Sequence, residues 1–259
     1  MSYNTAESDL VQAGSDTGKV RAAKPRLVQS RVEATMDTQV NDEAEHAQVV
    51  ASRLAAAAEA ARQASIAVAM TSLISSRGRR YAECRLSNFR CYVDAQSRAV
   101  AKLRSYLSEI TEHAATGFGV CLFGPCGSGK DHLAWALASG FIRKTGKRVE
   151  WASGAILFEQ LRNSFQGKKS ESEVMDSYRT APLLWLSDPL PVNGDLTQYQ
   201  NESLYRLLDA RYSACKPVLI TANLEPGKAD VAFGPAIARR LRESTLPIHC
   251  NWGSFKQSH

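Results

Sequence analysis

The stretch Gly124-Pro125-Cys126-Gly127-Ser128-Gly129-Lys130 decides the fold of this chain. It follows a short apolar run at 119–123 and precedes a stretch with helical periodicity at 131–145, which is the setting that a phosphate-binding loop requires. The glycines allow the backbone N–H groups to face inward, the helix N-terminus adds partial positive charge, and Lys130 supplies an ammonium for the outer phosphates. A glycine-rich turn that contains lysine by chance is the alternative. The motif predicts a nucleotide site with ATP and Mg²⁺ as cofactors.

Short apolar runs alternate with helical stretches on the C-terminal side of this loop. Besides the strand at 119–123 and the helix at 131–145, we expect strands at 148–152, 183–186 and 217–221 and helices at 155–165, 201–212 and around 237–241. Strands that alternate with helices are typical of a parallel sheet covered on both faces. The predicted fold class is therefore α/β, of the P-loop type.

One position departs from the phosphate-loop pattern. The residue after the lysine is normally Ser or Thr, whose hydroxyl holds Mg²⁺, and here it is Asp131. A carboxylate can ligate Mg²⁺, and Asp is equally suited to cap a helix N-terminus. A negative charge beside a triphosphate is unfavourable unless a cation lies between them. We therefore expect nucleotide binding to depend strongly on Mg²⁺.

The N-terminal part differs in composition. Residues 1–50 are rich in polar residues and show no sustained period, so we expect them to be disordered or to fold on a partner, whereas an Ala-rich stretch from about Glu43 to Ile74 predicts a long helix. That helix is either a plain linker or a surface for a partner. Ser75-Ser76-Arg77-Gly78 interrupts the pattern, which divides the chain into an extension, 1–76, and a P-loop domain, 77–259.

The charge is also uneven. The 259 residues include 32 Lys+Arg and 26 Asp+Glu, a formal net charge of +6, yet residues 1–50 carry −3 and the remainder carries +9. No apolar run is long enough to cross a bilayer and the first residues lack a signal-peptide pattern, so we expect a cytoplasmic protein without membrane contact. The six cysteines form no C-x-x-C pair, which argues against a disulfide framework and a structural zinc site.

Five segments together resemble one family. They are the run from Gly124 to Lys130 continued by Asp131-His132-Leu133-Ala134, the upstream Arg80-Tyr81 with Leu86-Ser87-Asn88-Phe89 and Tyr92, the strand and turn 217–224, Arg239-Arg240-Leu241, and the closing Asn251-Trp252-Gly253-Ser254-Phe255-Lys256. In this order they are similar to the AAA+ ATPase core of DnaC-type helicase loaders and of the related IstB-type transposition helpers. The resemblance spans residues 77–259 and does not include the first 70 residues.

The resemblance implies roles for individual residues. Asn223 falls on the polar sensor, Arg240 on an arginine finger that acts on a neighbouring protomer, and Lys256 on a C-terminal phosphate-sensing residue. A turn residue, a solvated helix charge and a tail residue are the plain alternatives. His132 is expected either to contact phosphate or to pack the first turn of its helix.

The second acidic motif is incomplete. The family pattern asks for a strand that ends in two carboxylates, and this chain has Ser187-Asp188-Pro189. In one register Asp188 is the catalytic acid and Ser187 replaces the metal ligand, and in the other Asp188 holds the metal and Pro189 replaces the base. Losing either group typically lowers the rate by about 10²–10⁴, so hydrolysis is expected to be weak or absent. Asp131 and Asp188 are the candidate Mg²⁺ ligands.

Basic residues indicate a nucleic-acid partner. Many Lys and Arg flank the loop with aromatics between them, namely Arg79, Arg80, Arg85, Arg90, Arg98, Arg104, Arg143, Lys144, Lys147 and Arg148. Such a mixture suits the backbone and bases of single-stranded DNA, although an ordinary solvated surface has the same composition. The resemblance implies a replicative helicase or a transposase as partner and self-association through ATP-bridged interfaces. The alternatives are a transposition helper on duplex DNA and a nucleotide-binding adaptor that does not hydrolyse ATP.

Overall fold

The computed structural model describes residues 26–165, 167, 170–191, 196–225 and 227–253, with side chains from residue 45 onward. Internal contacts divide the chain into one unit at Met1–Ala57 and a second at Ala58–His259. The division falls within α1 (Arg26–Arg77), the first helix, so it lies earlier than the boundary that the sequence suggests at 76/77. The sequence signal at 75–78 marks the end of a helix, and the use of residues 1–76 as a separate functional segment stays a prediction.

Helix α1 is longer than the Ala-rich stretch alone indicates. It begins at Arg26, well before Glu43, because no Gly or Pro occurs between Arg26 and Arg77. It ends where Gly78 adopts a φ of +96°. Within the second unit its final turns are amphipathic, and Ala69 and Leu73 are buried against the core.

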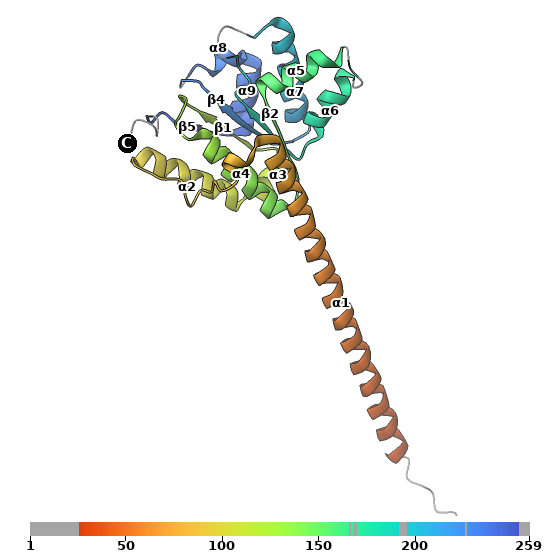
Figure 1. Cartoon of the computed structure of the whole chain (residues 1–259). Coiled ribbons are helices and arrows are strands. Elements are labelled where there is room, and N and C mark those ends of the chain that lie inside the picture. The colour runs from red at the N-terminus through yellow and green to blue at the C-terminus, as the bar shows by residue number, and fades with distance from the viewer. Residues whose placement is uncertain (1–25, 166, 168–169, 192–195, 226, 254–259) are drawn as a thin grey trace, which may run out of the picture. The chain divides into compact units, whose positions relative to one another are not determined.

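The second unit is a layered α/β domain (Figure 1). Its remaining elements are η1 (Arg79–Tyr81), α2 (Asp94–Ser108), α3 (Ile110–Thr116), β1 (Gly119–Phe123), α4 (Lys130–Thr145), β2 (Val149–Ser153), α5 (Gly154–Ser164), α6 (Glu171–Thr180), β3 (Leu183–Ser187), α7 (Gln198–Ser213), β4 (Val218–Ala222), α8 (Ala229–Phe233), α9 (Pro235–Ser244) and β5 (Thr245–His249). The five strands form one parallel sheet in the order β2-β3-β4-β1-β5. The predicted α/β fold class is confirmed.

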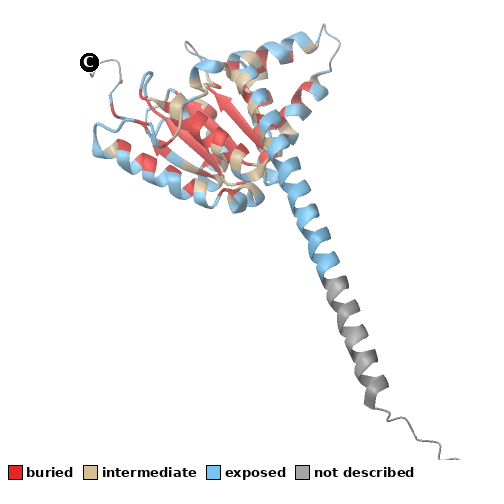
Figure 2. Cartoon of the chain, turned by 60° about the horizontal axis from the view of Figure 1, so that its bottom comes forward, coloured by how far each residue is buried: buried red, intermediate tan, exposed pale blue. Residues whose placement is uncertain are grey.

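Alternate residues of the strands face two separate cores. Val120 and Leu122 of β1 pack on the side of α2, α3 and α4, whereas Cys121 and Phe123 pack on the side of α5 to α9. Colouring by burial shows the strands as a buried layer between exposed helix faces (Figure 2). Because parallel strands end at one edge, the residues after β1, β3 and β4 meet there.

Six elements were not expected from the sequence, namely η1, α2, α3, α6, α8 and β5. Helix α6 has few apolar residues, and β5 contains Pro247, a residue that weakens a strand prediction. Strand β5 pairs with β1 at the edge of the sheet, where a missing backbone donor is tolerated. This strand leads the chain back to the phosphate loop.

Candidate nucleotide site

The phosphate loop has the backbone that its glycines permit. Gly124, Gly127 and Gly129 all have positive φ, and α4 begins directly after Gly129. A Cβ on Gly124 would lie 2.4 Å from the carbonyl oxygen of Cys250, so the close approach of the C-terminal segment also requires glycine there. The loop and the N-terminus of α4 together form the phosphate cradle that the sequence predicts.

Lys130 is held inside this cradle. Its side chain is buried, and Nζ donates hydrogen bonds to the carbonyl oxygens of Gly124 and Pro125, both at 2.8 Å, and to Oδ1 of Asn223 at 2.9 Å. Three acceptors use all three ammonium donors. The structure therefore brings Lys130 together with Asn223, the residue placed on the polar sensor, across 93 positions of sequence.

Asp188 follows β3 and lines the same cavity, whereas Ser187 does not. The hydroxyl of Thr221 donates to the buried Ser187 hydroxyl at 3.2 Å, so Ser187 is directed to the neighbouring strand. Burial and, after it, the charge of Asp131 raise the pKa of Asp188, while Lys130 and Arg77 oppose the rise. Asp188 is thus the carboxylate that the second acidic motif presents to the site.

Asp131 has partners of its own. Its Oδ2 lies 3.0 Å from the guanidinium of Arg77 and accepts a 3.4 Å hydrogen bond from the Tyr81 hydroxyl. The Arg77 guanidinium in turn lies 4.2 Å from the Tyr81 ring centroid and 5.1 Å from that of Trp151. The charge of Asp131 is therefore balanced by the last residue of α1, an interaction that no local pattern predicts.

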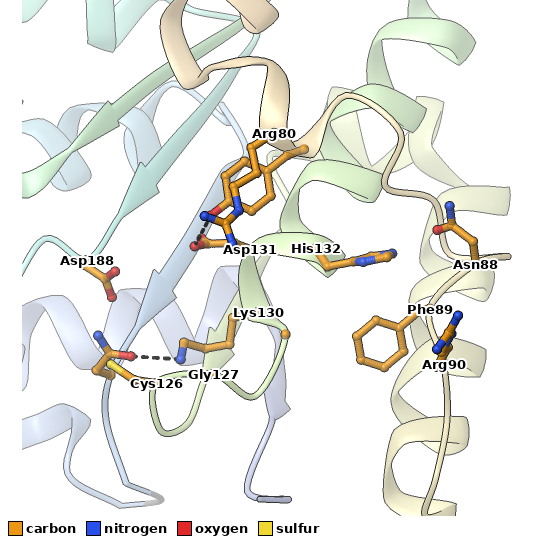
Figure 3. A pocket seen from close by; sticks show the side chains of 13 residues that line it. Arg80, Asn88, Phe89, Arg90, Cys126, Gly127, Lys130, Asp131, His132 and Asp188 are labelled. Carbon is orange, nitrogen blue, oxygen red and sulfur yellow. Dashed lines mark hydrogen bonds between the residues drawn. The ribbon is translucent and has the colours of Figure 1, made fainter. Parts of the chain in front are cut away.

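These residues surround a cavity of about 570 Å³. Figure 3 shows Lys130 and Asp188 on one side of it and the segment Asn88-Phe89-Arg90 on the other. Arg80 and Arg90 also line the cavity and are exposed, without an ion-pair partner among the described residues. The volume is within the range of small-ligand sites.

His132 positions the upstream wall. Its Nε2 donates to the carbonyl oxygen of Arg85 at 2.9 Å, and its ring meets that of Phe89 edge-on at 5.2 Å. Of the two expectations for this residue, the contacts favour packing over phosphate binding. Residues 80–90, which form this wall, were not predicted from the sequence as part of the site. The resemblance of that segment to the family was the sequence signal that could have identified it.

The C-terminal segment forms hydrogen bonds with the phosphate loop and with the strand that precedes it. Trp252 donates a 2.7 Å hydrogen bond from Nε1 to the carbonyl oxygen of Ser128, and the backbone N–H of Cys250 donates to the Phe123 carbonyl oxygen. The Ser128 hydroxyl is buried and has no hydrogen-bond partner among the described residues. The ending that resembles the family thus contacts the phosphate loop through Trp252.

The residues present can accommodate Mg²⁺. Oδ1 of Asp188 is buried without a hydrogen-bond partner in the described part of the chain, and an orphan carboxylate oxygen is a suitable ligand. Asp131 lies close enough to influence the pKa of Asp188, but it shares its charge with Arg77. Asp188 is accordingly the better placed of the two predicted ligands. The described residues contain no cluster of three or more His, Cys, Asp or Glu side chains that could hold a metal by themselves.

Among the predicted residues outside the loop that the structure describes, Arg240 is not brought to the cavity. Arg240 on α9 lies 2.5 Å from Asp209 and donates to the Tyr205 hydroxyl at 3.2 Å, so it faces α7. A role on a neighbouring protomer needs a second chain and stays a prediction. Lys256 lies outside the described residues. None of the described helices is long and apolar enough to span a membrane.

Two proteins of known family are similar to this chain in sequence. DnaC of Escherichia coli strain K12, a replicative helicase loader, is 24% identical over 175 residues, or 67% of this chain and 69% of DnaC. An insertion-sequence ATP-binding protein of Sinorhizobium fredii, y4iQ/y4nD/y4sD, is 33% identical over 170 residues, or 63% of this chain and 52% of that protein.

Solved structures share the fold. The DnaC helicase loader superposes with a TM-score of 0.59 at 22% identity, covering 66% of this chain and 99% of the other. DnaI gives a TM-score of 0.54 at 21% identity, covering 64% and 90%. DnaA from Aquifex aeolicus with bound AMPPCP gives 0.52 at 19% identity, covering 64% and 50%.

A family model described as IstB-like ATP binding protein matches residues 25–243, which include all of α1 and every residue but the last of α9, the helix before β5. This range contains the phosphate loop, Asp188 and Asn223. The chain belongs to the family of IstB-like ATP binding proteins, which is related to the DnaC helicase loader.

Proposed function

We propose that the chain is an ATP-binding accessory protein of DNA replication that acts in the cytoplasm in the manner of a helicase loader. In this proposal the nucleotide state changes its affinity for a replicative helicase and for single-stranded DNA. The observation that carries the nucleotide part is the buried Lys130, held at the mouth of the cavity by Asn223 and two loop carbonyl oxygens. The similarity to DnaC over 69% of its length supports the replication part.

Each group of site residues has its own role in ATP binding. The inward N–H groups of the loop receive the phosphates, and Lys130 exchanges its carbonyl acceptors for phosphate oxygens. Asp188 would hold Mg²⁺, which would supply positive charge to neutralise the phosphates. Asn223, which follows β4, then loses its hydrogen bond to Lys130. This loss is the local change by which nucleotide binding alters the end of β4.

Hydrolysis is expected to be slow. With Ser187 directed at Thr221, the second acidic motif presents a single carboxylate, Asp188, where two are typical, so either metal positioning or water activation is weakened. ATP binding and exchange, rather than rapid turnover, would then drive the switch. A coupling between nucleotide and partner of about 1–3 kcal/mol is typical of such systems.

Self-association completes the proposal. Arg240 would leave Asp209 and reach the nucleotide of a neighbouring protomer, so that ATP bridges the two chains. The extension 1–76 would provide the contact with the helicase. The role of Arg240 comes from the resemblance to loaders, and the role of the extension comes from its long helix as a surface for a partner.

The test measures binding of labelled single-stranded DNA and of a replicative helicase to the full chain with ATP, with ADP and without nucleotide. The proposal expects affinities that differ about fivefold or more between nucleotide states. Equal affinities in all three conditions would refute the switch, and an absence of ATP binding would refute the nucleotide site.

A second candidate is an insertion-sequence helper that recruits a transposase on duplex DNA. The family match over residues 25–243 and the 33% identity to the Sinorhizobium protein favour it. ATP-dependent assembly on duplex but not single-stranded DNA would select this function. A third candidate is an adaptor that binds ATP without hydrolysing it, which the replacement of an acidic residue by Ser187 favours. This function would be selected if the native chain binds ATP but turns it over no faster than Lys130→Ala does.

A further inference from the structure

A hollow of about 360 Å³ lies away from the nucleotide cavity, between α2, α4 and the segment after η1. Its lining includes small and apolar residues, among them Leu107, Ala136 and Gly140. Four cationic side chains and no Asp or Glu line it, namely Arg85, Arg104, Arg143 and Lys144. The two sites share none of their lining residues.

The lining of the hollow carries four positive charges and no negative charge. None of the four cations forms an ion pair within the described part of the chain. Partial burial and, after it, the charge of Arg85 lower the pKa of Arg143, which indicates that two guanidinium groups repel each other there, with Glu83 opposing the shift. An anion in the hollow would relieve this repulsion.

The end of α4 is arranged so that its cations remain available. Arg62 of α1 donates to the carbonyl oxygens of Arg143 at 2.9 Å and Lys144 at 3.3 Å. These bonds satisfy backbone carbonyl oxygens that the C-terminus of a helix leaves without a donor. The side chains of Arg143 and Lys144 are therefore not needed to cap the helix. Arg62 also adds a positive charge beside the hollow, partly balanced by Glu59.

We propose that this hollow, lined by Arg85, Arg104, Arg143 and Lys144, binds the backbone phosphates of single-stranded nucleic acid. The proposal rests on the proposed function and names the surface that it uses. Cations from three separate segments surround a shallow depression, which suits a chain of repeating negative charges that passes across it. The hydroxyl of Ser87, which also lines the hollow, is a suitable phosphate donor.

Single-stranded nucleic acid bound in this hollow would lie against α4, the helix that begins at the phosphate loop. Helix α4 begins with Lys130 at the nucleotide cavity, and near its other end Lys144 lines the hollow. The segment that includes Arg85 is fixed to the nucleotide side by His132. The two sites are therefore joined by one rigid element and one hydrogen-bonded segment, which gives the nucleotide state a physical connection to the strand.

The test compares two double variants that remove equal charge. Arg104→Ala with Lys144→Ala removes two cations of the hollow, whereas Arg162→Ala with Lys102→Ala removes one arginine and one lysine that are also exposed but do not line it. Arg85 is left unchanged because its backbone contacts His132. The probe is a fluorescent oligo-dT of about 30 nucleotides, titrated at several salt concentrations.

The variant Arg104→Ala with Lys144→Ala is expected to bind oligo-dT about tenfold more weakly at low salt. The slope of the logarithm of its binding constant against the logarithm of salt concentration should be smaller in magnitude by about 1.4, since each lost phosphate contact removes about 0.7. The control variant should differ little from the native chain. Both should bind an ATP analogue like the native chain, which also verifies folding.

Equal losses in the two variants would overturn the assignment to the hollow while leaving DNA binding intact. Failure of the native chain to bind oligo-dT with any nucleotide would overturn the hollow and the single-strand part of the proposed function together. Stronger competition by polyglutamate than by unlabelled oligo-dT would show an acidic protein partner and overturn the nucleic-acid assignment.

Discussion

The guanidinium of Arg77, the last residue of α1, forms a 3.0 Å ion pair with the carboxylate of Asp131, the residue after the phosphate-loop lysine. Phosphate loops usually place a metal-binding hydroxyl at the position of Asp131. In this chain that position carries a negative charge balanced by a cation from α1. The pair therefore links the final turn of α1 to the start of α4, directly beside the nucleotide cavity.

Removing Arg77 should weaken both the fold and nucleotide binding. Arg77→Ala leaves Asp131 without its counter-charge and removes a guanidinium that packs on Tyr81, so we expect unfolding to become easier by about 1–3 kcal/mol. The uncompensated carboxylate should weaken ATP binding about fivefold, since such a charge costs about 1 kcal/mol. Denaturant titration and ATP titration measure the two effects. Arg79→Ala, an exposed neighbour, is the control, and an equal effect of both variants would contradict the role of the pair.

Neutralising Asp131 should reduce the dependence of ATP binding on Mg²⁺. In Asp131→Asn the repulsion between carboxylate and triphosphate is lost and Arg77 becomes free to attract phosphate, so affinity in EDTA should rise relative to affinity in Mg²⁺. Titration of an ATP analogue in both buffers gives the ratio. A ratio equal to that of the native chain would show that Asp131 does not act on the bound nucleotide.

The hydrogen bond from Trp252 to the loop should support nucleotide affinity. Trp252→Phe retains an aromatic ring but loses the Nε1 donor to the Ser128 carbonyl oxygen, which costs about 1 kcal/mol and loosens the loop. Trp135→Phe is a matched control because Trp135 is buried and its Nε1 has no partner among the described residues. We expect ATP affinity to fall severalfold for Trp252→Phe alone, measured by titration. A comparable loss in Trp135→Phe would indicate a general packing effect.

Cysteine reactivity should report occupancy of the loop. Cys126 is exposed and lines the nucleotide cavity, whereas burial raises the pKa of Cys121 and of Cys250 to about 12 and leaves them unreactive at neutral pH. A maleimide followed by mass spectrometry should label Cys126 in the free chain, and ATP should protect it. Cys91, which is exposed and does not line the cavity, serves as the unprotected reference. Labelling of Cys126 unchanged by saturating ATP would contradict the position of the nucleotide.

Local patterns predicted the central part of the fold. The strand at 119–123, the glycine loop and the helix after it are determined by neighbouring residues, so their sequence signal is strong. Strand β5 was missed because Pro247 interrupts its pattern, and the pairing with β1 that stabilises it joins residues far apart in sequence.

The candidate site was predictable where a motif carries it. Lys130 and Asn223 were named from the loop and from the family resemblance, and the structure brings them together. The contacts of Arg77 with Asp131 and of Trp252 with Ser128 depend on tertiary packing over 54 and 124 positions, for which single-sequence periodicity gives no signal. The sequence therefore identified the phosphate cradle but not the residues that support it.

Binding of ATP at the phosphate loop is the central claim, and a ligand-induced thermal shift tests it most directly. ATP with Mg²⁺ should raise the Tm of the native chain and that of Lys102→Ala, an exposed lysine outside the cavity, because a ligand that binds only the folded state stabilises it. Lys130→Ala should unfold cooperatively with no shift at the same ATP concentration, since it lacks the ammonium at the cradle. Equal shifts in Lys130→Ala and the native chain, or no shift in the native chain, would contradict the account.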